Sequence, residues 1–448
     1  MNYVAQTHMQ PTHARKVFPC FDEPAIKARF NVTLFRKKHM ISLSNMKQIL
    51  SQDLGKDWVA DHYAVTPLMS TQLLAFVVCD FISKEVITPT NVLFRVWTRR
   101  EAIDQTTYVS DVGGRVLTFY EEYFNYPFML PKQDLIGVPD YIGSMENWGL
   151  IIQREEAMSY VPLETSEYFK EYVTLTLSHE LSHVWFGNLV STSWWDDLWL
   201  NEGFANYIAH VAMDFIVPSW LPLDNFVIKS VQRALAFDGL ISSHPVYVPV
   251  SNPEEISQTF DTISYHKGGS ILRMLQFILG DATFQKGLQR LIRNRAYGLM
   301  VHDDLWVALR TQSIIDGKPL DVKGIMDTWT LQMNYPTVFM ERKGHGIRLS
   351  QSRYLLDKTA TDPGTYTSPF EYKWEIPFTY TTQKMKDFNK NEADIIWMGK
   401  DGRDVFLPRV KCGNGWFIGN IKQYGFYRVN YPEDNWYYSI VGTSMKRS

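Results

Sequence analysis

Two histidines and two glutamates near the middle of the sequence have the types and spacing of a metal site. His179 and His183 are four residues apart, Glu180 lies between them, and Glu202 follows further along the chain. Residues four apart on an α-helix lie one turn above each other, so both imidazoles can point at one ion. A catalytic Zn²⁺ takes three protein ligands from nitrogen and oxygen donors and leaves a fourth position to water. His179, His183 and Glu202 would supply these ligands, and Glu180, turned by about 100° around the helix axis, would lie beside the bound water as a general base.

The flanking residues predict the two helices that must hold these groups. A first helix is expected over residues 166–186, because its apolar residues form a stripe on a different face from the two histidines. Gly187 would end it. A second helix is expected to begin near Asn201 and to run until Pro218, which places Glu202 in its first turn. On spacing alone, two ordinary histidines on a helix surface remain an alternative.

The composition favours a multidomain globular protein. A chain of 448 residues is too long for one hydrophobic core, and a length of roughly 150 residues per domain predicts about three domains. Apolar residues make up 45% and the net charge is only -3, which argues against disorder and against nucleic acid as a partner. Cys20, Cys79 and Cys412 are too far apart to indicate a disulfide framework or a cysteine zinc site.

The pattern of apolar residues divides the chain into four parts. Residues 1–97 consist of short alternating or aliphatic runs typical of strands, and the run 73–82, about half the ~20 residues that cross a bilayer, is expected to be a buried strand. Residues 98–336 show helical periods, and residues 337–431 return to short strands that fit a small β-sandwich. Residues 432–448 begin a further element. The fold class expected is therefore multidomain α+β.

The stretch HELSHVWFGN to WWDDLWLNEGFANY, residues 179–207, closely resembles the zinc signature of the aminopeptidase N type of gluzincin metallopeptidases. Further resemblances follow the order of that family and cover practically the whole chain; they lie at residues 11–34, 141–151, 260–275 and 421–431. The resemblance implies one Zn²⁺ in a thermolysin-like catalytic domain over residues 98–336. It also implies an incomplete N-terminal β-sandwich or saddle domain before it, a small β-sandwich after it, and the start of a missing helical domain at residues 432–448.

Glu146 is the main candidate for binding the substrate's amino terminus. A carboxylate fixed in a loop of small residues can pair with a free α-ammonium, although GSMEN alone would also fit an ordinary turn glutamate. The resemblance of residues 141–151 to the G-x-M-E-N exopeptidase motif favours the amine-binding role, and it assigns Gln10 as a helper of Glu146. Gly143 and Ser144 are the small residues of this loop, where the backbone can approach a ligand closely. The family usually has alanine at Ser144, so its hydroxyl is expected to alter the first side-chain pocket, which Met145 is expected to face.

Tyr265 is the candidate donor to the oxyanion that forms when water attacks the peptide carbonyl. A core tyrosine in an amphipathic helix is the other interpretation, and the Y-x-K-G frame at residues 265–268, which resembles the family's segment, favours the catalytic one. His266 and Val184 depart from the family's usual residues. Neither is a ligand position, so tuning rather than loss of activity is expected.

The function predicted is zinc-dependent removal of single, neutral N-terminal residues from peptides with a free N-terminus. His8 stands where relatives that select acidic residues carry an aspartate, which disfavours a glutamyl preference. Full-length relatives suggest a homodimer, and kinship leaves the plasma membrane and the cytoplasm both open as locations. The alternatives are a catalytically silent peptide-binding fragment and, less favoured, a bifunctional epoxide hydrolase, whose relatives lack the small β-sandwich expected after Pro336.

Overall fold

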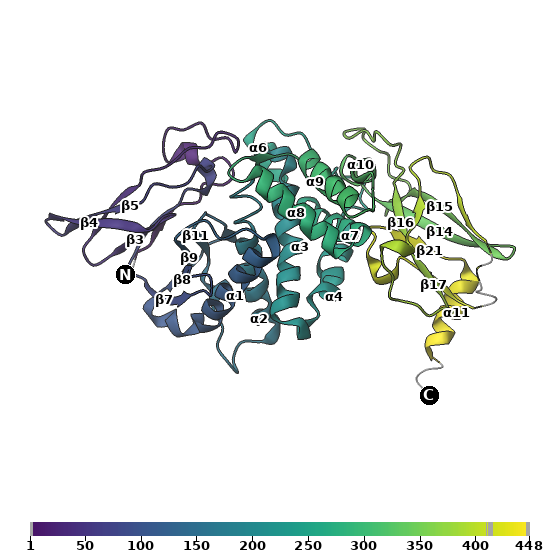
Figure 1. The fold of residues 1–448 in the computed structure, drawn as a ribbon, viewed down its shortest axis with the longest axis horizontal. Helices are drawn as coiled ribbons and strands as arrows, with labels where there is room; N and C mark the ends of the chain where they lie inside the picture. The colour runs from purple at the N-terminus through teal and green to yellow at the C-terminus, as the bar shows by residue number, and fades with distance from the viewer. Residues whose placement is uncertain (1–2, 409, 411–414, 445–448) are drawn as a thin grey trace. The chain divides into compact units, whose positions relative to one another are not determined.

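The computed structural model describes residues 3–408, 410 and 415–444, and these form two compact units. The first unit contains residues 1–223, 250–258 and 289–302, and the second contains residues 224–249, 259–288 and 303–448. Each unit is described by itself. Figure 1 follows the chain through both of them.

The first unit begins with two antiparallel sheets of three strands. One has the order β1-β6-β3 and the other the order β2-β5-β4. The strands are β1 (Ala5–Gln6), β2 (Thr33–Lys37), β3 (Ile41–Ser44), β4 (Gln48–Gly55), β5 (Trp58–Tyr63) and β6 (Phe76–Cys79). The apolar run over residues 73–82 supplies β6, whose Val77 and Cys79 are fully buried. The prediction of a buried strand there agrees with the structure.

A third sheet of five strands underlies the candidate site. Its order is β10 (Ser144–Met145), β11 (Leu150–Arg154), β9 (Lys132–Val138), β8 (Leu93–Thr98) and β7 (Ile82–Ile87), with β11, β9 and β8 parallel. Helix α1 (Thr107–Phe124) connects β8 to β9 and packs against β7 and β8. The sheet therefore contains strands from both sides of the boundary expected at residue 97. We propose that this boundary lies before β7, because the strands of one sheet share a core.

Helices α2 (Glu167–Ser182) and α3 (Trp199–Ile216) pack against each other and against α1. Ser166 caps α2, its hydroxyl accepting a bond from the Phe169 amide at 3.2 Å. Helix α2 ends at Ser182, earlier than the expected residue 186. Residues 183–185 form turns, and Phe186 makes a β-bridge with Val190. Helix α3 begins two residues before the expected Asn201. Both predicted helices are present.

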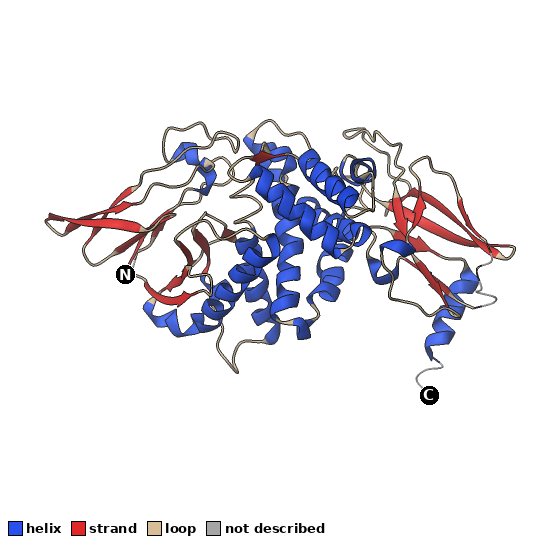
Figure 2. Ribbon diagram, viewed as in Figure 1, coloured by secondary structure: helices blue, strands red, loops and turns tan. Residues whose placement is uncertain are grey.

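The second unit combines helices with a group of short strands, as Figure 2 shows. Four strands form a sheet in the order β19-β15-β14-β21, and two further pairs, β16-β18 and β17-β20, accompany it. The strands are β14 (Pro336–Lys343), β15 (Gly346–Arg353), β16 (Ile376–Phe378), β17 (Tyr380–Thr382), β18 (Ile396–Met398), β19 (Val405–Leu407), β20 (Phe417–Gly419) and β21 (Arg428–Asn430). These strands agree with the β-rich region expected after Pro336.

The remaining helices and strands complete both units. They are β12 (Ser191–Thr192), α4 (Pro222–Phe226), α5 (Gln232–Phe237), α6 (Pro253–Gln258), α7 (Gly268–Leu279), α8 (Asp281–Arg295), β13 (Leu299–Met300), α9 (His302–Ile315), α10 (Val322–Thr330) and α11 (Glu433–Ser444). Two short π-helices, η7 (Val227–Val231) and η8 (Ile263–Lys267), belong to the second unit. The architecture is thus β-rich, then mainly helical, then β-rich again, as the sequence predicted.

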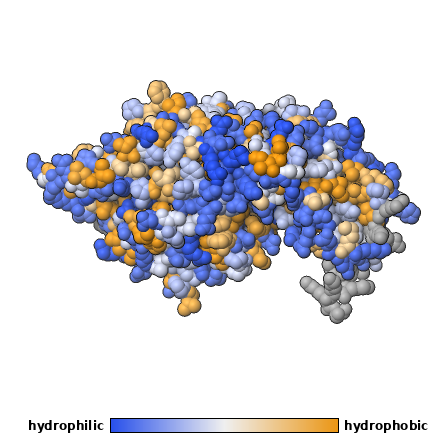
Figure 3. All heavy atoms as spheres, in the orientation of Figure 1, coloured by the Kyte–Doolittle hydropathy of each residue, from blue (hydrophilic) through white to orange (hydrophobic). Residues whose placement is uncertain are grey.

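The surface, the helices and the cysteines bear on the environment of the chain. On the face seen in Figure 3, hydrophobic residues lie in small groups among hydrophilic ones. Among the residues that the structure describes, none of the helices has the length and apolar character needed to cross a bilayer. Cys20 and Cys79 are free thiols. Cys412 lies outside the described residues.

Candidate metal centre and active site

The three predicted metal ligands lie together in the first unit. The Nε2 atoms of His179 and His183 are 3.1 Å apart, and each lies 3.5 Å from Oε2 of Glu202. Donor atoms bound tetrahedrally at about 2.0–2.1 Å from one ion are about 3.3 Å from each other. The spacing and chemistry of these three groups therefore fit Zn²⁺, with room in the coordination geometry for a fourth ligand.

The end of helix α2 orients His183. This residue is the C-cap of α2, and its Nδ1 lies 3.2 Å from the Phe186 carbonyl oxygen. Donation from Nδ1 to that carbonyl assigns the tautomer in which Nε2 keeps its lone pair for a metal. The chain turns back sharply here: Gly187 has φ +135°, and a Cβ on it would lie 3.3 Å from the His183 carbonyl oxygen. A glycine at this position lets the backbone pass close to the ligand.

Opposite charges in the same buried space separate the pKa values of the ligands. For His183, burial opposes the charged form, but the Glu202 and Glu146 carboxylates outweigh it and raise its pKa to about 10. For Glu202, burial acts in the opposite direction, and the imidazoles of His183 and His179 lower its pKa to about 2. Burial lowers the pKa of His179. Because a metal binds the deprotonated Nε2, metal binding must overcome this raised pKa of His183.

Glu180 has the properties of a proton acceptor and donor. Its side chain is on α2 between the two histidines and is buried. Burial raises its pKa well above the usual value; the charge of His183 opposes this shift, and the negative charges of Glu146 and Glu202 add to it. A carboxylate whose pKa is raised can take a proton and return it later in the same reaction.

Glu146 lies in the loop that joins β10 to β11. Gln10 Nε2 donates to Glu146 Oε1 at 3.0 Å, so these two predicted partners are brought together. Met145, on β10, is fully buried, and Ser144, beside it on the same strand, is half-buried. Gly143, with φ +80°, precedes them. Burial raises the pKa of Glu146, while the positive charge of His183 opposes this.

Tyr265 belongs to the second unit, on the π-helix η8. Its backbone amide donates to the Asp261 carbonyl at 3.1 Å, and two further amides of this segment donate to the Asp261 carboxylate: those of Ile263 and Ser264, at 2.9 and 3.1 Å. π-helical turns are frequent at functional sites. The part that Tyr265 plays in catalysis remains a prediction.

Sequence reasoning missed several groups around Glu146. Asn188 Nδ2 donates to the Glu146 carbonyl at 2.9 Å, whereas the sequence indicated only a helix end at Gly187-Asn188. The Tyr141 hydroxyl is hydrogen-bonded to His8 Nδ1 at 2.7 Å, and the pKa of Tyr141 is raised by burial and by the charges of Glu180 and Glu146. A polar residue directly after a helix-ending glycine is a weak signal, and it was the only one available for Asn188.

Together, these groups have the donor set and the adjacent carboxylates of a zinc hydrolase site. Residues 108–329 match the Peptidase family M1 domain, and residues 1–73 match the Peptidase M1 N-terminal domain. The chain belongs to peptidase family M1.

Curated relatives agree with this family. The chain is 41% identical over 445 residues to aminopeptidase N of Oryctolagus cuniculus and 41% identical over 446 residues to aminopeptidase N of Homo sapiens; each alignment covers 97% of this chain and 45% of the relative. It is 37% identical over 441 residues to the thyrotropin-releasing hormone-degrading ectoenzyme of Rattus norvegicus, covering 97% of this chain and 41% of that protein. The chain therefore spans less than half the length of these relatives.

Proposed function

We propose that this chain is a zinc-dependent aminopeptidase that removes single, neutral residues from the amino terminus of peptides. The observation that carries the proposal is the group His179, His183 and Glu202, with ligand atoms 3.1–3.5 Å apart, beside the buried carboxylates of Glu180 and Glu146. Membership of peptidase family M1 and the similarity to aminopeptidase N support it.

His179, His183 and Glu202 would hold the zinc ion. When bound, zinc would polarise the first peptide carbonyl and lower the pKa of the attacking water. Glu180 would accept a proton from that water and pass it to the leaving nitrogen, a role that its raised pKa supports. Tyr265 would donate a hydrogen bond to the developing oxyanion.

Glu146 would restrict the reaction to the first residue of the peptide. Its carboxylate, held by Gln10, would pair with the substrate's α-ammonium and so fix the distance from the amino terminus to the reacting carbonyl. Gly143, Ser144 and Met145 would line the pocket for the first side chain. A neutral first residue is favoured because His8, which is hydrogen-bonded to Tyr141, stands where relatives that select acidic residues carry an aspartate.

The test measures zinc content and turnover in the purified chain. Alanyl- and leucyl-p-nitroanilide should be hydrolysed, and Glu180→Gln should keep one zinc while losing turnover by a factor of at least about 10². His183→Ala should lose both zinc and turnover. Stoichiometric zinc without hydrolysis by the wild-type chain would favour the catalytically silent peptide-binding fragment. Normal hydrolysis by Glu180→Gln would contradict the role of Glu180.

A further inference from the structure

Every residue of the loop that carries Glu146 is tied to another part of the first unit. The Glu146 carbonyl accepts a bond from Asn188, and Asn147 Nδ2 donates to the Gln72 carbonyl at 3.4 Å. Asn45 Nδ2 donates to the Trp148 carbonyl at 3.0 Å. The Gly149 carbonyl accepts two bonds. These contacts fix the position of the backbone at Glu146 and at the three residues after it.

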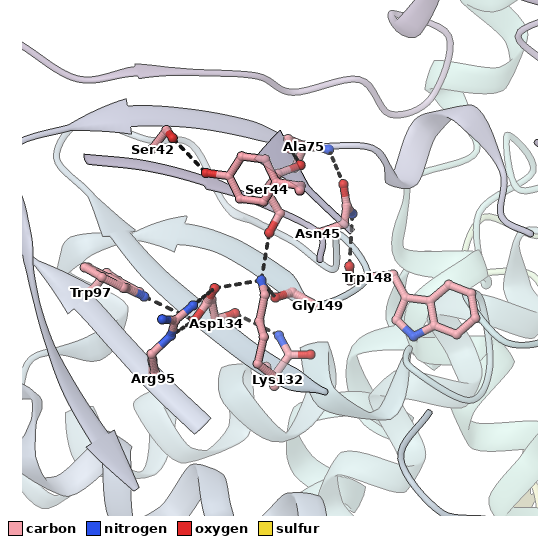
Figure 4. A network of polar contacts seen from close by, with 12 residues as sticks. Ser42, Ser44, Asn45, Ala75, Arg95, Trp97, Lys132, Asp134, Trp148 and Gly149 are labelled. Carbon is pink, nitrogen blue, oxygen red and sulfur yellow. Dashed lines mark hydrogen bonds and ion pairs between the residues drawn. The ribbon is translucent and has the colours of Figure 1, made fainter. Parts of the chain in front are cut away.

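Lys132 provides the only charged side-chain contact to this loop's backbone among the described residues. Its Nζ donates to the Gly149 carbonyl at 2.7 Å and to the Ser44 carbonyl at 2.7 Å, and it forms an ion pair with Asp134 at 2.7 Å. Figure 4 shows the ammonium group at the meeting point of these three partners, with Asn45 reaching Trp148 beside it. The Lys132 side chain is only 2% exposed.

Burial of a lysine is costly unless its charge is paired and its donors are used. Lys132 uses its three donors on one carboxylate and two carbonyls, and one of these carbonyls lies three residues after Glu146. Asp134 adds a backbone bond from its own amide to the same Gly149 carbonyl, at 3.0 Å. Lys132 therefore fixes the far end of the loop, as Gln10 fixes the Glu146 carboxylate.

We propose that Lys132 is a positioning residue for Glu146, holding the 146–149 loop where the Glu146 carboxylate can meet the substrate's α-ammonium. The inference rests on the proposed aminopeptidase function and deepens it. It predicts that loss of Lys132 weakens recognition of the amino group more than it weakens the metal site, because none of the metal ligands contacts Lys132 in the described structure.

The experiment replaces Lys132 by methionine in the full chain. Asp134 keeps Arg95 as a partner at 2.6 Å, so the carboxylate is not left without a cation. KM for alanyl-p-nitroanilide should rise about tenfold or more, with kcat changed less and zinc content unchanged. Leucine hydroxamate should bind the variant more weakly, whereas 4-methylpentanoyl hydroxamate, which has the same zinc-binding group and no amine, should bind as it does to the wild type.

Arg95→Met is the matched control. Arg95 forms an ion pair with the same Asp134 at 2.6 Å and lines the same cavity of about 520 Å³ as Lys132, but it does not contact the 146–149 loop, and Asp134 keeps Lys132 as its cation. This variant should keep KM within about twofold of the wild type. Hydrogen exchange of the peptide spanning residues 144–154 should be faster in Lys132→Met than in Arg95→Met, a readout that does not depend on turnover.

Each outcome decides between the proposals. Unchanged exchange in residues 144–154, or equal weakening of both hydroxamates, would overturn the positioning role of Lys132. A wild-type chain without zinc or turnover would overturn the proposed function, and the exchange data would then still test the hold on the loop. If Lys132→Met does not fold, Lys132→Gln, which keeps two N–H donors, replaces it. Failure of both variants to fold would make Lys132 a folding residue and contradict the inference.

Discussion

Two buried lysines, one in each unit, form ion pairs of the same kind. Lys132 pairs with Asp134 at 2.7 Å, and Lys267 pairs with Asp238 at 2.8 Å. Each ammonium also donates to a backbone carbonyl, that of Gly149 or of Asn334. Burial lowers the pKa of both lysines. Lys132, on β9, reaches the Glu146 loop in space through its bond to Gly149, whereas Lys267 lies two residues after Tyr265 on the same π-helix.

The two pairs differ in what remains when the lysine is removed. Asp134 has a second cation, Arg95, and also accepts from the Trp97 indole at 3.2 Å. Within the described residues, Asp238 has Lys267 as its only cation, and its other partners are the Ser243 hydroxyl and the Asn334 amide. Loss of Lys132 leaves a carboxylate that is still paired, so we expect it to affect function more than folding. Loss of Lys267 leaves a buried carboxylate without a cation, so we expect it to affect folding.

The largest effect is expected for Lys267→Met. It leaves the buried Asp238 carboxylate without a cation, which typically costs about 3–5 kcal/mol of unfolding free energy. Urea unfolding followed by tryptophan fluorescence measures the loss, and Lys132→Met should lose clearly less. The double variant Lys267→Met/Asp238→Asn should recover part of the stability. Equal losses for the two single lysine variants would remove the distinction between the pairs.

Tyr265→Phe should affect rate rather than stability. Removing one oxyanion donor typically lowers kcat by about 10²–10³-fold, and we expect that loss with zinc content and melting temperature near those of the wild type. Steady-state kinetics on leucyl-p-nitroanilide measures it. Tyr168→Phe, at an exposed position on α2, is the control and should retain full kcat. A kcat for Tyr265→Phe equal to that of this control would contradict the role of Tyr265 as an oxyanion donor.

Gly149→Ala tests the loop that Lys132 holds. Gly149 has φ +84°, and a Cβ there would lie 2.3 Å from the Asn45 carbonyl oxygen. The positive φ and the clash together should cost about 2 kcal/mol of unfolding free energy, and KM should rise as the loop shifts. Gly55→Ala, with φ +72° and open space around the Cβ, separates the backbone strain from the clash and should cost less. Identical melting temperatures for the two variants would contradict the close packing.

The smallest effect is a pH dependence of the second unit. His244 is hydrogen-bonded to Asp261 at 2.8 Å; burial disfavours its charged form, but Asp261 outweighs burial and raises its pKa above 6.5. A raised pKa stabilises the fold fully below 6.5, and this contribution is lost as the pH rises through the folded-state pKa. Melting temperatures should fall in that window for the wild type and less for His244→Gln. The opposite slope would contradict the pairing.

The metal ligands were predictable because their geometry is local. The spacing of His179 and His183 places both imidazoles on one side of a helix. The observed helix Glu167–Ser182 holds His179 and has His183 as its C-cap, and Trp199–Ile216 holds Glu202. The pairing of Gln10 with Glu146 was not local: these residues are far apart in sequence, and only the family resemblance indicated that they meet.

Lys132 and Asn45 could not be assigned from the sequence because their contacts depend on which strands become neighbours. One signal was present: Lys132, Gln133 and Asp134 are polar residues at the start of the buried strand β9, where paired or hydrogen-bonded groups must be expected. The partition of the sheets was missed for the same reason. The apolar run of β8 is recognisable as a strand in the sequence, but it does not identify β9 as the partner of β8.

Strands β7 and β8 belong to the same sheet as β9, and this determines where the peptidase region can be separated from the residues before it. Strand β9 is buried along its whole length and bonds to β8 on one side and β11 on the other. A polypeptide beginning at residue 98 would lack β8 and would present β9 as an open apolar edge, which favours aggregation between molecules. Soluble expression of the peptidase region alone should therefore require a start before Ile82, even though the family domain match begins at residue 108.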